Sequence, residues 1–163
     1  MTPLVLTRQG LRLGARLYPC AIGRGGRATD KREGDRATPV GTHRIIGMLY
    51  RPDRLPRPAP WAAPIGLRAL WSDDPQDASY NAPVLAPHAA SHERLRRADP
   101  LYDLILITDW NMFPARPGRG SAIFLHQWRR RGFPTEGCIA LSRPDLLDLA
   151  RRIAPGTPLR VPA

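Results

Sequence analysis

Lysine is almost absent from this chain of 163 residues, because Lys31 is the only lysine among 25 basic residues and the others are arginine. Acidic residues are also few, 14 in all, so the formal net charge is +11. A basic surface attracts polyanions, anionic membranes or carboxylate-rich substrates. The arginines are dispersed from Arg8 to Arg160 with no long block, which does not favour a nucleic-acid-binding tail. A strong preference for arginine is also what a GC-rich genome produces.

Cysteine is scarce as well, and Cys20 and Cys138 form no CxxC pair. Together with four scattered histidines they do not make a zinc site, so we expect no metal and no other cofactor. The apolar run Leu104–Ile107 is far shorter than the roughly 18 residues that cross a bilayer, so no integral membrane segment is expected. The first residues lack a charged region followed by a long apolar run, and no secretory signal is predicted.

The length fits one domain over residues 1–163, and the hydrophobic fraction of 42% argues against wholesale disorder. The 19 prolines and 14 glycines divide the chain into short segments. Short or alternating apolar runs bounded by turn residues are typical of strands. We predict a mainly β fold, a small sandwich or barrel that opens with a hairpin. The expected strands are 4–7, 11–13, 17–22, 42–50, 104–108, 122–126, 138–141 and 159–161.

Helix signals are few. Between Ser142 and Gly156 a capping serine, an early proline and an acid precede apolar residues at helical spacing, which predicts a short C-terminal helix. A second short helix is predicted around 91–98, where Ser91 can cap the first turn. Residues 51–87 are rich in proline, aspartate and tryptophan, and we interpret them as a long ordered insertion that caps a cleft.

Cys138 and His126 are the residues whose chemistry points to catalysis. An expected strand ends at His126, an arginine-rich loop follows, and Gly137 precedes Cys138 at the start of the next apolar run. An imidazole that takes the thiol proton creates a thiolate nucleophile, and backbone N–H groups at a glycine turn can hold an oxyanion. The two residues can meet across adjacent strands. Taken alone, however, the pair fits a structural interpretation at least as well, because buried cysteines are common.

Three segments carry a wider pattern. Residues 120–126 read GSAIFLH, residues 135–141 read TEGCIAL, and residues 34–42 read GDRATPVGT. The first two resemble the signature of the L,D-transpeptidases with a YkuD-type catalytic domain, in which a histidine precedes a Ser/Thr-x-Gly-Cys segment. The third resembles the Thr-Pro-x-Gly turn of the same family. The resemblance is specific because two motifs occur in the right order, and it extends over residues 3–161.

The resemblance implies a β-sandwich or barrel of the L,D-transpeptidase type and a role for each motif residue. Cys138 would be the acylated nucleophile and His126 its base. Thr135 would orient the imidazole through its backbone carbonyl, while Gly137 and the Cys138 N–H would hold the oxyanion. The implied reaction is acyl transfer between peptidoglycan stem peptides, with no cofactor and no metal.

Two positions depart from the family pattern. Glu136 stands two residues before the cysteine, where many members have histidine, and Ala140 stands two residues after it, where many have arginine. Glu136 is predicted to orient an amine acceptor or to bind an arginine, with a simple surface acid as the alternative. The missing cation could be replaced by three loop arginines that pair with substrate carboxylates, unless they form a solvated basic loop: Arg129, Arg130 and Arg131.

Other residues are weaker candidates for lining the cleft. Aromatic side chains among them pack more often than they bind. The candidates are Ser121, Tyr80 with Asn81, and Trp71 with Asp73 and Asp74.

The expected partner is the stem peptide of peptidoglycan, with no nucleic acid and no membrane segment, and the chain is expected to be a monomer. The attacked amide is either the diaminopimelate–D-Ala bond or the L-Ala–D-Glu bond. The substrate favours the periplasm or cell envelope as the location. Two alternatives stay open: a cysteine-dependent carboxypeptidase or hydrolase that uses the same residues, and a non-enzymatic basic protein that binds cell wall or nucleic acid.

Overall fold

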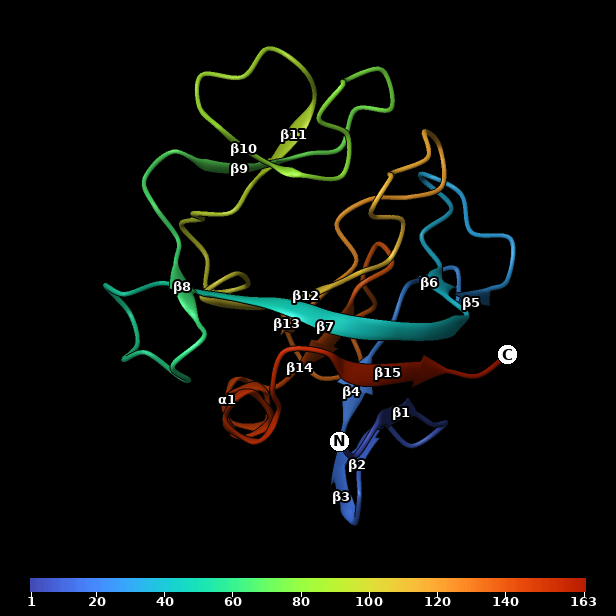
Figure 1. Ribbon diagram of the computed structural model, residues 1–163. Coiled ribbons are helices and arrows are strands. Elements are labelled where there is room, and N and C mark those ends of the chain that lie inside the picture. Colours follow the sequence, from blue (N-terminus) through green and yellow to red (C-terminus); the bar gives the residue numbers. More distant parts are fainter.

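A ten-stranded sheet organises the computed structural model, which describes residues 1–163 (Figure 1). Its order is β3-β2-β1-β15-β7-β12-β13-β14-β4, with β8 beside β7. The strands are β1 (Leu4–Leu6), β2 (Leu11–Leu13), β3 (Arg16–Tyr18), β4 (Cys20–Ala21), β7 (Gly41–Tyr50), β8 (Ala63–Pro64), β12 (Leu104–Thr108), β13 (Phe124–Gln127), β14 (Ile139–Leu141) and β15 (Thr157–Val161). The predicted mainly β fold is confirmed, as is the opening hairpin of β1 and β2.

The two edges of this sheet are separated by a single residue of the chain. β3 forms one edge and ends at Tyr18, β4 forms the other and begins at Cys20, and Pro19 joins them. The sheet therefore curls back until its edges nearly meet, as in a barrel. The predicted strand 17–22 is thus divided between both edges. Gly10 packs against the connection between β3 and β4, where no side chain would fit: a Cβ on Gly10 would lie 2.3 Å from the Tyr18 carbonyl oxygen.

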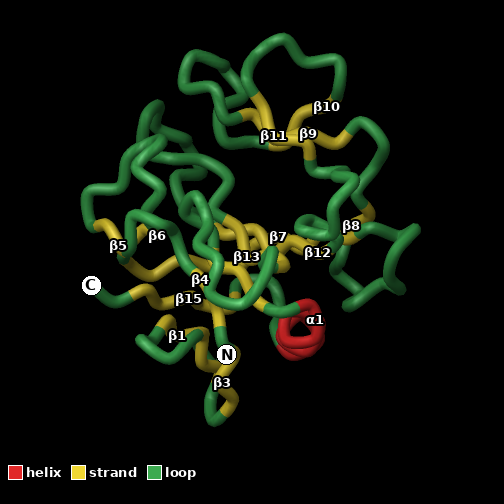
Figure 2. The backbone as a smooth tube through the Cα atoms, turned by 180° about the vertical axis from the view of Figure 1, so that it is seen from behind, coloured by secondary structure: helices red, strands yellow, loops and turns green.

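Strand β12 separates two hydrophobic cores. Its side chains alternate, so Leu104 and Leu106 belong to one core while Ile105 and Ile107 belong to the other. Burial on both faces explains why this strand has an unbroken apolar sequence. Helix α1 (Arg143–Arg152) covers the first core (Figure 2). Ser142 caps its N-terminus as predicted, because the Ser142 hydroxyl accepts the Asp145 N–H.

A separate three-stranded sheet, β10-β9-β11, stands above one end of the large sheet and covers the second core (Figure 1). Its strands are β9 (Ala69–Ser72), β10 (Pro83–Leu85) and β11 (His92–Arg94). The predicted helix around 91–98 is wrong, because β11 pairs with β9 there. Pairing with the buried strand that carries Trp71 overrides the local capping signal of Ser91. A third, two-stranded sheet joins β5 (Arg27–Ala28) to β6 (Thr38–Pro39).

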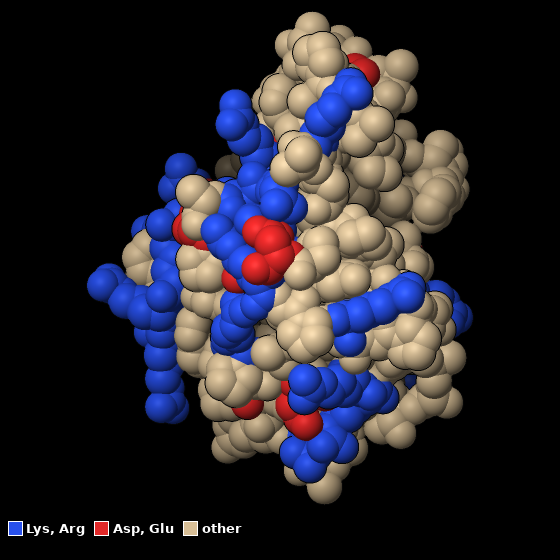
Figure 3. Space-filling view, turned by 90° about the vertical axis from the view of Figure 1, so that its left-hand side faces the viewer, with Lys and Arg blue, Asp and Glu red and all other residues tan.

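Basic side chains lie in several groups over the face shown in Figure 3, with few acidic side chains between them. The single lysine is not a surface charge. Lys31 is buried, with its Nζ 2.7 Å from Asp35 Oδ1 and 2.6 Å from the Arg32 carbonyl oxygen. The basic surface is therefore made by arginine alone. No helix of the structure is both long and apolar enough to span a membrane.

Candidate active site

The register of two parallel strands brings His126 and Cys138 to the same face of the large sheet. In the β13–β14 pair Leu125 lies beside Ile139 and His126 beside Ala140. Leu125 and Ile139 point into the first core, so His126, Ala140 and the preceding Cys138 point to the opposite face. His126 and Cys138 are diagonal neighbours on this face, as the sequence predicts for residues on adjacent strands.

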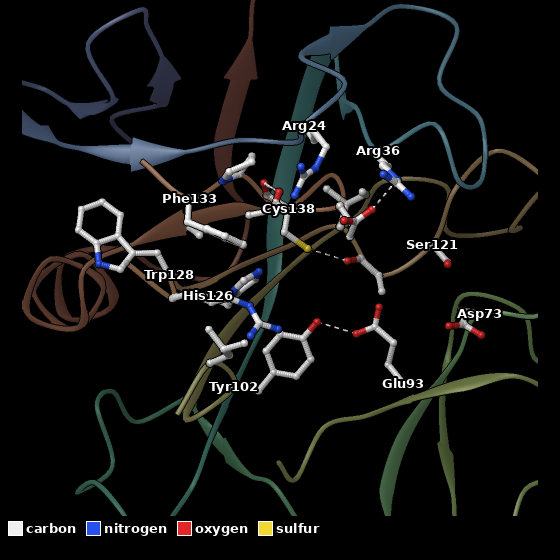
Figure 4. Close-up of a pocket in the computed structure, with 18 of the residues that line it drawn as sticks. Arg24, Arg36, Asp73, Glu93, Tyr102, Ser121, His126, Trp128, Phe133 and Cys138 are labelled. Atoms are coloured by element: carbon white, nitrogen blue, oxygen red, sulfur yellow. Dashed lines mark hydrogen bonds and ion pairs between the residues drawn. The ribbon is translucent and has the colours of Figure 1, made fainter. Parts of the chain in front are cut away.

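This face opens into a pocket of about 500 Å³, which contains both residues (Figure 4). Its floor is the β13–β14 pair, and loops from distant parts of the chain form its walls. Of the predicted site residues, the lining includes Cys138, His126, Thr135, Glu136, Arg129 and Ser121, together with Asp73. It also includes residues that the sequence analysis did not select, among them Arg24, Arg36, Glu93, Arg97 and Tyr102.

The turn that carries the cysteine is closed by its own threonine. The Thr135 hydroxyl donates to the Cys138 carbonyl oxygen at 2.6 Å and accepts the Gly137 N–H at 3.1 Å. Gly137 has a φ of 138°, in the region that favours glycine, and a Cβ there would lie 3.0 Å from the Ala37 carbonyl oxygen. The Gly137 N–H is therefore already bonded within the turn. The Cys138 N–H, in contrast, donates to no protein acceptor.

The upstream Thr-Pro-x-Gly motif holds this turn in place. The buried hydroxyl of Thr38 donates to the Gly137 carbonyl oxygen at 2.8 Å and accepts the Gly23 N–H at 3.0 Å. The Arg24 N–H donates to the Thr135 carbonyl oxygen at 2.8 Å. Because these bonds are buried and mostly involve backbone groups, they fix the cysteine more firmly than its own short strand could.

The Cys138 thiol is partly buried and makes two hydrogen bonds within the chain. Its Sγ donates to the Ala122 carbonyl oxygen at 3.1 Å and accepts the Phe124 N–H at 3.4 Å. Burial, followed by the negative charge of Glu93, raises the pKa of Cys138 to about 12. Ala122 is itself held in a positive-φ conformation, with a φ of 52°, by the Asn81 side chain, which accepts its N–H.

His126 is neutral in the free protein and is oriented from its own strand. Its Nδ1 lies 2.8 Å from the Gln127 carbonyl oxygen, which can only accept, so Nδ1 carries the proton and Nε2 is the basic nitrogen. The carbonyl of Thr135, the predicted orienting group, is bonded to the Arg24 N–H instead. Burial lowers the pKa of His126 to about 4. Both shifts favour the neutral forms of the two groups, a thiol and an imidazole, over a thiolate–imidazolium pair.

Arginines from three segments surround the catalytic turn. Arg36 Nε lies 3.0 Å from Glu136 Oε2. Glu136 therefore binds an arginine, which is one of the roles predicted for it. Arg129 lies over the Phe133 ring at 5.9 Å. The Arg24 side chain lines the pocket and makes no ion pair with the chain's own acids. In the view of Figure 4 it lies on the Cys138 side of the pocket, away from Glu93 and Asp73.

The opposite side of the pocket is acidic. Glu93 from β11 accepts the Tyr102 hydroxyl at 2.5 Å, and Asp73 follows β9 on the same side. Tyr102 also packs edge to face on the His126 ring, with 5.2 Å between the ring centroids. Burial raises the pKa of the Glu93 carboxyl. Neither Glu93 nor Tyr102 lies in a sequence motif, and Glu93 is placed in the pocket by the pairing of β11 with β9.

Four predicted substrate-binding residues do not line this pocket. Asn81 is buried, and its amide contacts Trp110, Asn111, Trp71 and Ala122, while the Tyr80 hydroxyl donates to Glu33 at 2.5 Å. Both therefore support the pocket wall from behind, because their polar groups are already used. The other two are loop arginines outside the lining: Arg130, which lies over Phe133, and Arg131.

Residues 4–161 match the family described as the L,D-transpeptidase catalytic domain, YkuD. Since the match spans nearly the whole chain, this chain belongs to the L,D-transpeptidase family. Among solved structures, an L,D-transpeptidase from Mycobacterium smegmatis is similar, with 14% identity and a TM-score of 0.46. The match covers 99% of this chain and 58% of that protein, so the chain spans little more than half of its length. No curated protein matches the chain significantly.

Proposed function

We propose that this protein is a peptidoglycan L,D-transpeptidase that cross-links stem peptides through a thioester on Cys138. The observation that carries the proposal is the position of the Cys138 thiol and the His126 imidazole on one face of the β13–β14 pair, inside a pocket of about 500 Å³. Membership of the L,D-transpeptidase family supports the reaction class. Nothing in the proposed chemistry calls for a metal or cofactor.

Acylation begins when the thiol leaves the Ala122 carbonyl and passes its proton to Nε2 of His126. The sulfur attacks the carbonyl carbon of an amide whose acyl side is an L-centre and whose amine belongs to a D-residue. The C–S bond forms, the C–N bond breaks, and His126 returns the proton to the departing amine. The Cys138 N–H, which has no protein acceptor, supplies a hydrogen bond to the oxyanion.

Arginines of the pocket suit the carboxylates of a stem peptide. Arg24 is available for such a contact, because no acid of the chain pairs with it, whereas Arg36 is already paired with Glu136. This arrangement can replace the cation that is missing at Ala140, since arginine binds carboxylates in a bidentate manner. Of the three loop arginines, only Arg129 is positioned to join it.

Two donor amides are compatible with this chemistry, diaminopimelate–D-Ala and L-Ala–D-Glu, since both join an L-centre to a D-residue. The experiment is incubation of the purified protein with defined muropeptide monomers, followed by sequencing of the products by tandem mass spectrometry. We expect cross-linked dimers, and the acyl residue at the new bond identifies the donor amide. Cys20→Ala should give the same dimers, and Cys138→Ala should give none.

Other products would point to other functions. Release of shortened stems without dimers would identify a cysteine-dependent hydrolase. Unchanged binding to cell wall by Cys138→Ala, with no product from the unaltered protein, would identify a non-enzymatic binder. Because the substrate is cell-wall peptide, we also propose that the protein acts in the cell envelope or periplasm as a monomer.

A further inference from the structure

The acidic side of the pocket has no role in the acylation chemistry above. Glu93 projects from β11 into the same pocket as Cys138, and its charge is close enough to contribute, after burial, to the raised pKa of that thiol. Figure 4 shows the Glu93 carboxylate directed toward the centre of the pocket, with Tyr102 on one side of it. A carboxylate near the sulfur disfavours the thiolate, so we expect Glu93 to contribute to a different step of the reaction.

A second carboxylate beside it lacks a partner. Asp73 lines the same pocket, and its Oδ1 is buried with no hydrogen-bond partner. Buried polar atoms in proteins are almost always hydrogen-bonded, so an orphaned acceptor in a substrate pocket indicates a donor that arrives with the substrate. The oxygens of a carboxylate accept hydrogen bonds, so the missing group is a donor, and a cationic donor makes the stronger bond.

No cation of the chain neutralises Glu93. The groups that face it are the Tyr102 hydroxyl, the carboxylates of Asp73 and Glu33, and the guanidinium of Arg97. Arg97 is held by Asp99, with two hydrogen bonds of 2.9 and 2.6 Å. Burial and the neighbouring acids raise the pKa of Glu93. Such a carboxylate is a stronger base than an exposed one, because taking a proton removes a buried charge.

We propose that Glu93, assisted by Asp73, binds the ammonium group of the acceptor stem peptide and takes its proton as the amine attacks the Cys138 thioester. This inference rests on the proposed transpeptidase function, and it concerns the second half of that reaction. It also distinguishes the two sides of the pocket: arginines hold the carboxylates of the stems, and the acids hold the amine that becomes the cross-link.

The transfer step balances with the groups present. The acceptor ammonium gives one proton to Glu93, and the free amine attacks the thioester carbonyl, so the C–N bond forms. The nitrogen of the tetrahedral intermediate then gives its second proton to Nε2 of His126, the C–S bond breaks, and His126 returns that proton to the sulfur. Glu93 releases its proton to water once the product leaves. The net products are the amide, the thiol and one proton.

Glu93→Gln separates this role from a structural one, because the amide oxygen still accepts the Tyr102 hydroxyl. The experiment follows the acyl-enzyme by intact mass in two steps: loading with a donor muropeptide, then transfer after addition of an acceptor that carries a free amine. We expect Glu93→Gln to load within about threefold of the unaltered rate and to transfer about 100-fold more slowly. Asp73→Asn should chiefly raise the KM for the acceptor, and Glu93→Asp should recover part of the transfer rate.

The matched control is Asp30→Asn, which removes one negative charge from an exposed acid that lies outside the pocket and pairs with Arg32. It should transfer at close to the unaltered rate. The proposal is overturned if Glu93→Gln and Asp73→Asn both transfer normally, or if loading falls as much as transfer. Absence of any acyl-enzyme in the unaltered protein would instead refute the proposed function itself. Circular dichroism tests separately whether Glu93→Gln is folded, and if it is not, an unchanged acceptor KM in Asp73→Asn overturns the proposal.

Discussion

The two sides of the pocket are built in opposite ways. The cysteine side is a turn of four residues whose geometry is fixed by backbone hydrogen bonds, by the Thr135 hydroxyl and by the buried hydroxyl of Thr38. The acidic side consists of side chains that the three-stranded sheet carries from more than 30 residues upstream of that turn. Hydrogen bonds to the backbone tolerate few substitutions, whereas a side chain on a sheet can be exchanged without altering the strand. The cysteine side therefore suits formation of the thioester, and the acidic side suits the choice of the acceptor amine.

The largest expected effect is the loss of the nucleophile. Cys138→Ala should abolish cross-linking, by at least about 10⁴-fold, because no other group can form the thioester. Cys20→Ala is the matched control, since Cys20 is the other free cysteine of the chain and lies outside the pocket. Dimer formation measured by chromatography should be unchanged in that control. Residual activity in Cys138→Ala beyond background would contradict the assignment.

Loss of the base should have the next largest effect. His126→Asn should slow acylation about 10²- to 10⁴-fold. In the unaltered protein, acylation should rise as the pH passes upward through the His126 pKa of about 4, because only the neutral imidazole accepts the thiol proton. It should then stay level through neutral pH, since the thiol remains protonated to about pH 12. Single-turnover loading from about pH 3.5, just below the His126 value, to about pH 9 measures this profile. A persistent acid limb in His126→Asn would refute the role.

A smaller effect is expected when the turn is loosened. Thr38→Val keeps the shape of the side chain but leaves the Gly137 carbonyl and the Gly23 N–H without their partner. The free energy of unfolding should fall by about 1–3 kcal/mol, and loading should slow about tenfold. Chemical denaturation and the loading assay measure these two changes. Thr7→Val, which removes a hydroxyl contact in the distant first hairpin, should leave loading unaffected. Equal effects of the two variants on loading would mean that Thr38 does not hold the site.

The smallest effect should come from substitution of Arg24, the pocket arginine that we propose binds a substrate carboxylate. Arg24→Gln should raise the KM for the donor several-fold, with kcat little changed, because a carboxylate contact away from the scissile bond stabilises ground and transition states alike. Arg16→Gln removes a charge far from the pocket, where the arginine pairs with Asp148, and should change neither constant. Steady-state kinetics with the donor muropeptide measure the difference. A loss confined to kcat would place Arg24 at the reacting bond instead.

Most strands, and the position of Cys138 and His126 in one pocket, could be predicted from the sequence because their signals are local. Apolar alternation located the strands, and a short motif located Cys138 and His126 on neighbouring ones. The helix expected at 91–98 was wrong, since pairing with β9 decided the structure of that segment. For the same reason Glu93 could not be selected, because nothing near it in the sequence reports that β9 and β11 lie above the pocket.

Details of orientation were also beyond the sequence. A motif identifies Thr135 but not which of its groups is used, and its carbonyl is taken by the Arg24 N–H while its hydroxyl closes the turn. The imidazole is oriented by the Gln127 carbonyl, a backbone group that any residue could supply and that leaves no trace in the sequence. Asn81 has a fully satisfied side chain, which only the packed structure reveals.

The central claim is that the Cys138 thiol carries the acyl group from one stem to the next. The most direct measurement is mass spectrometry of the protein after brief exposure to a donor muropeptide, with digestion to locate the adduct. The account predicts a hydroxylamine-sensitive thioester on the peptide that contains Cys138, which disappears as dimers form when an acceptor is added. Dimers that form without any adduct on Cys138, or an adduct that no acceptor can discharge, would contradict it.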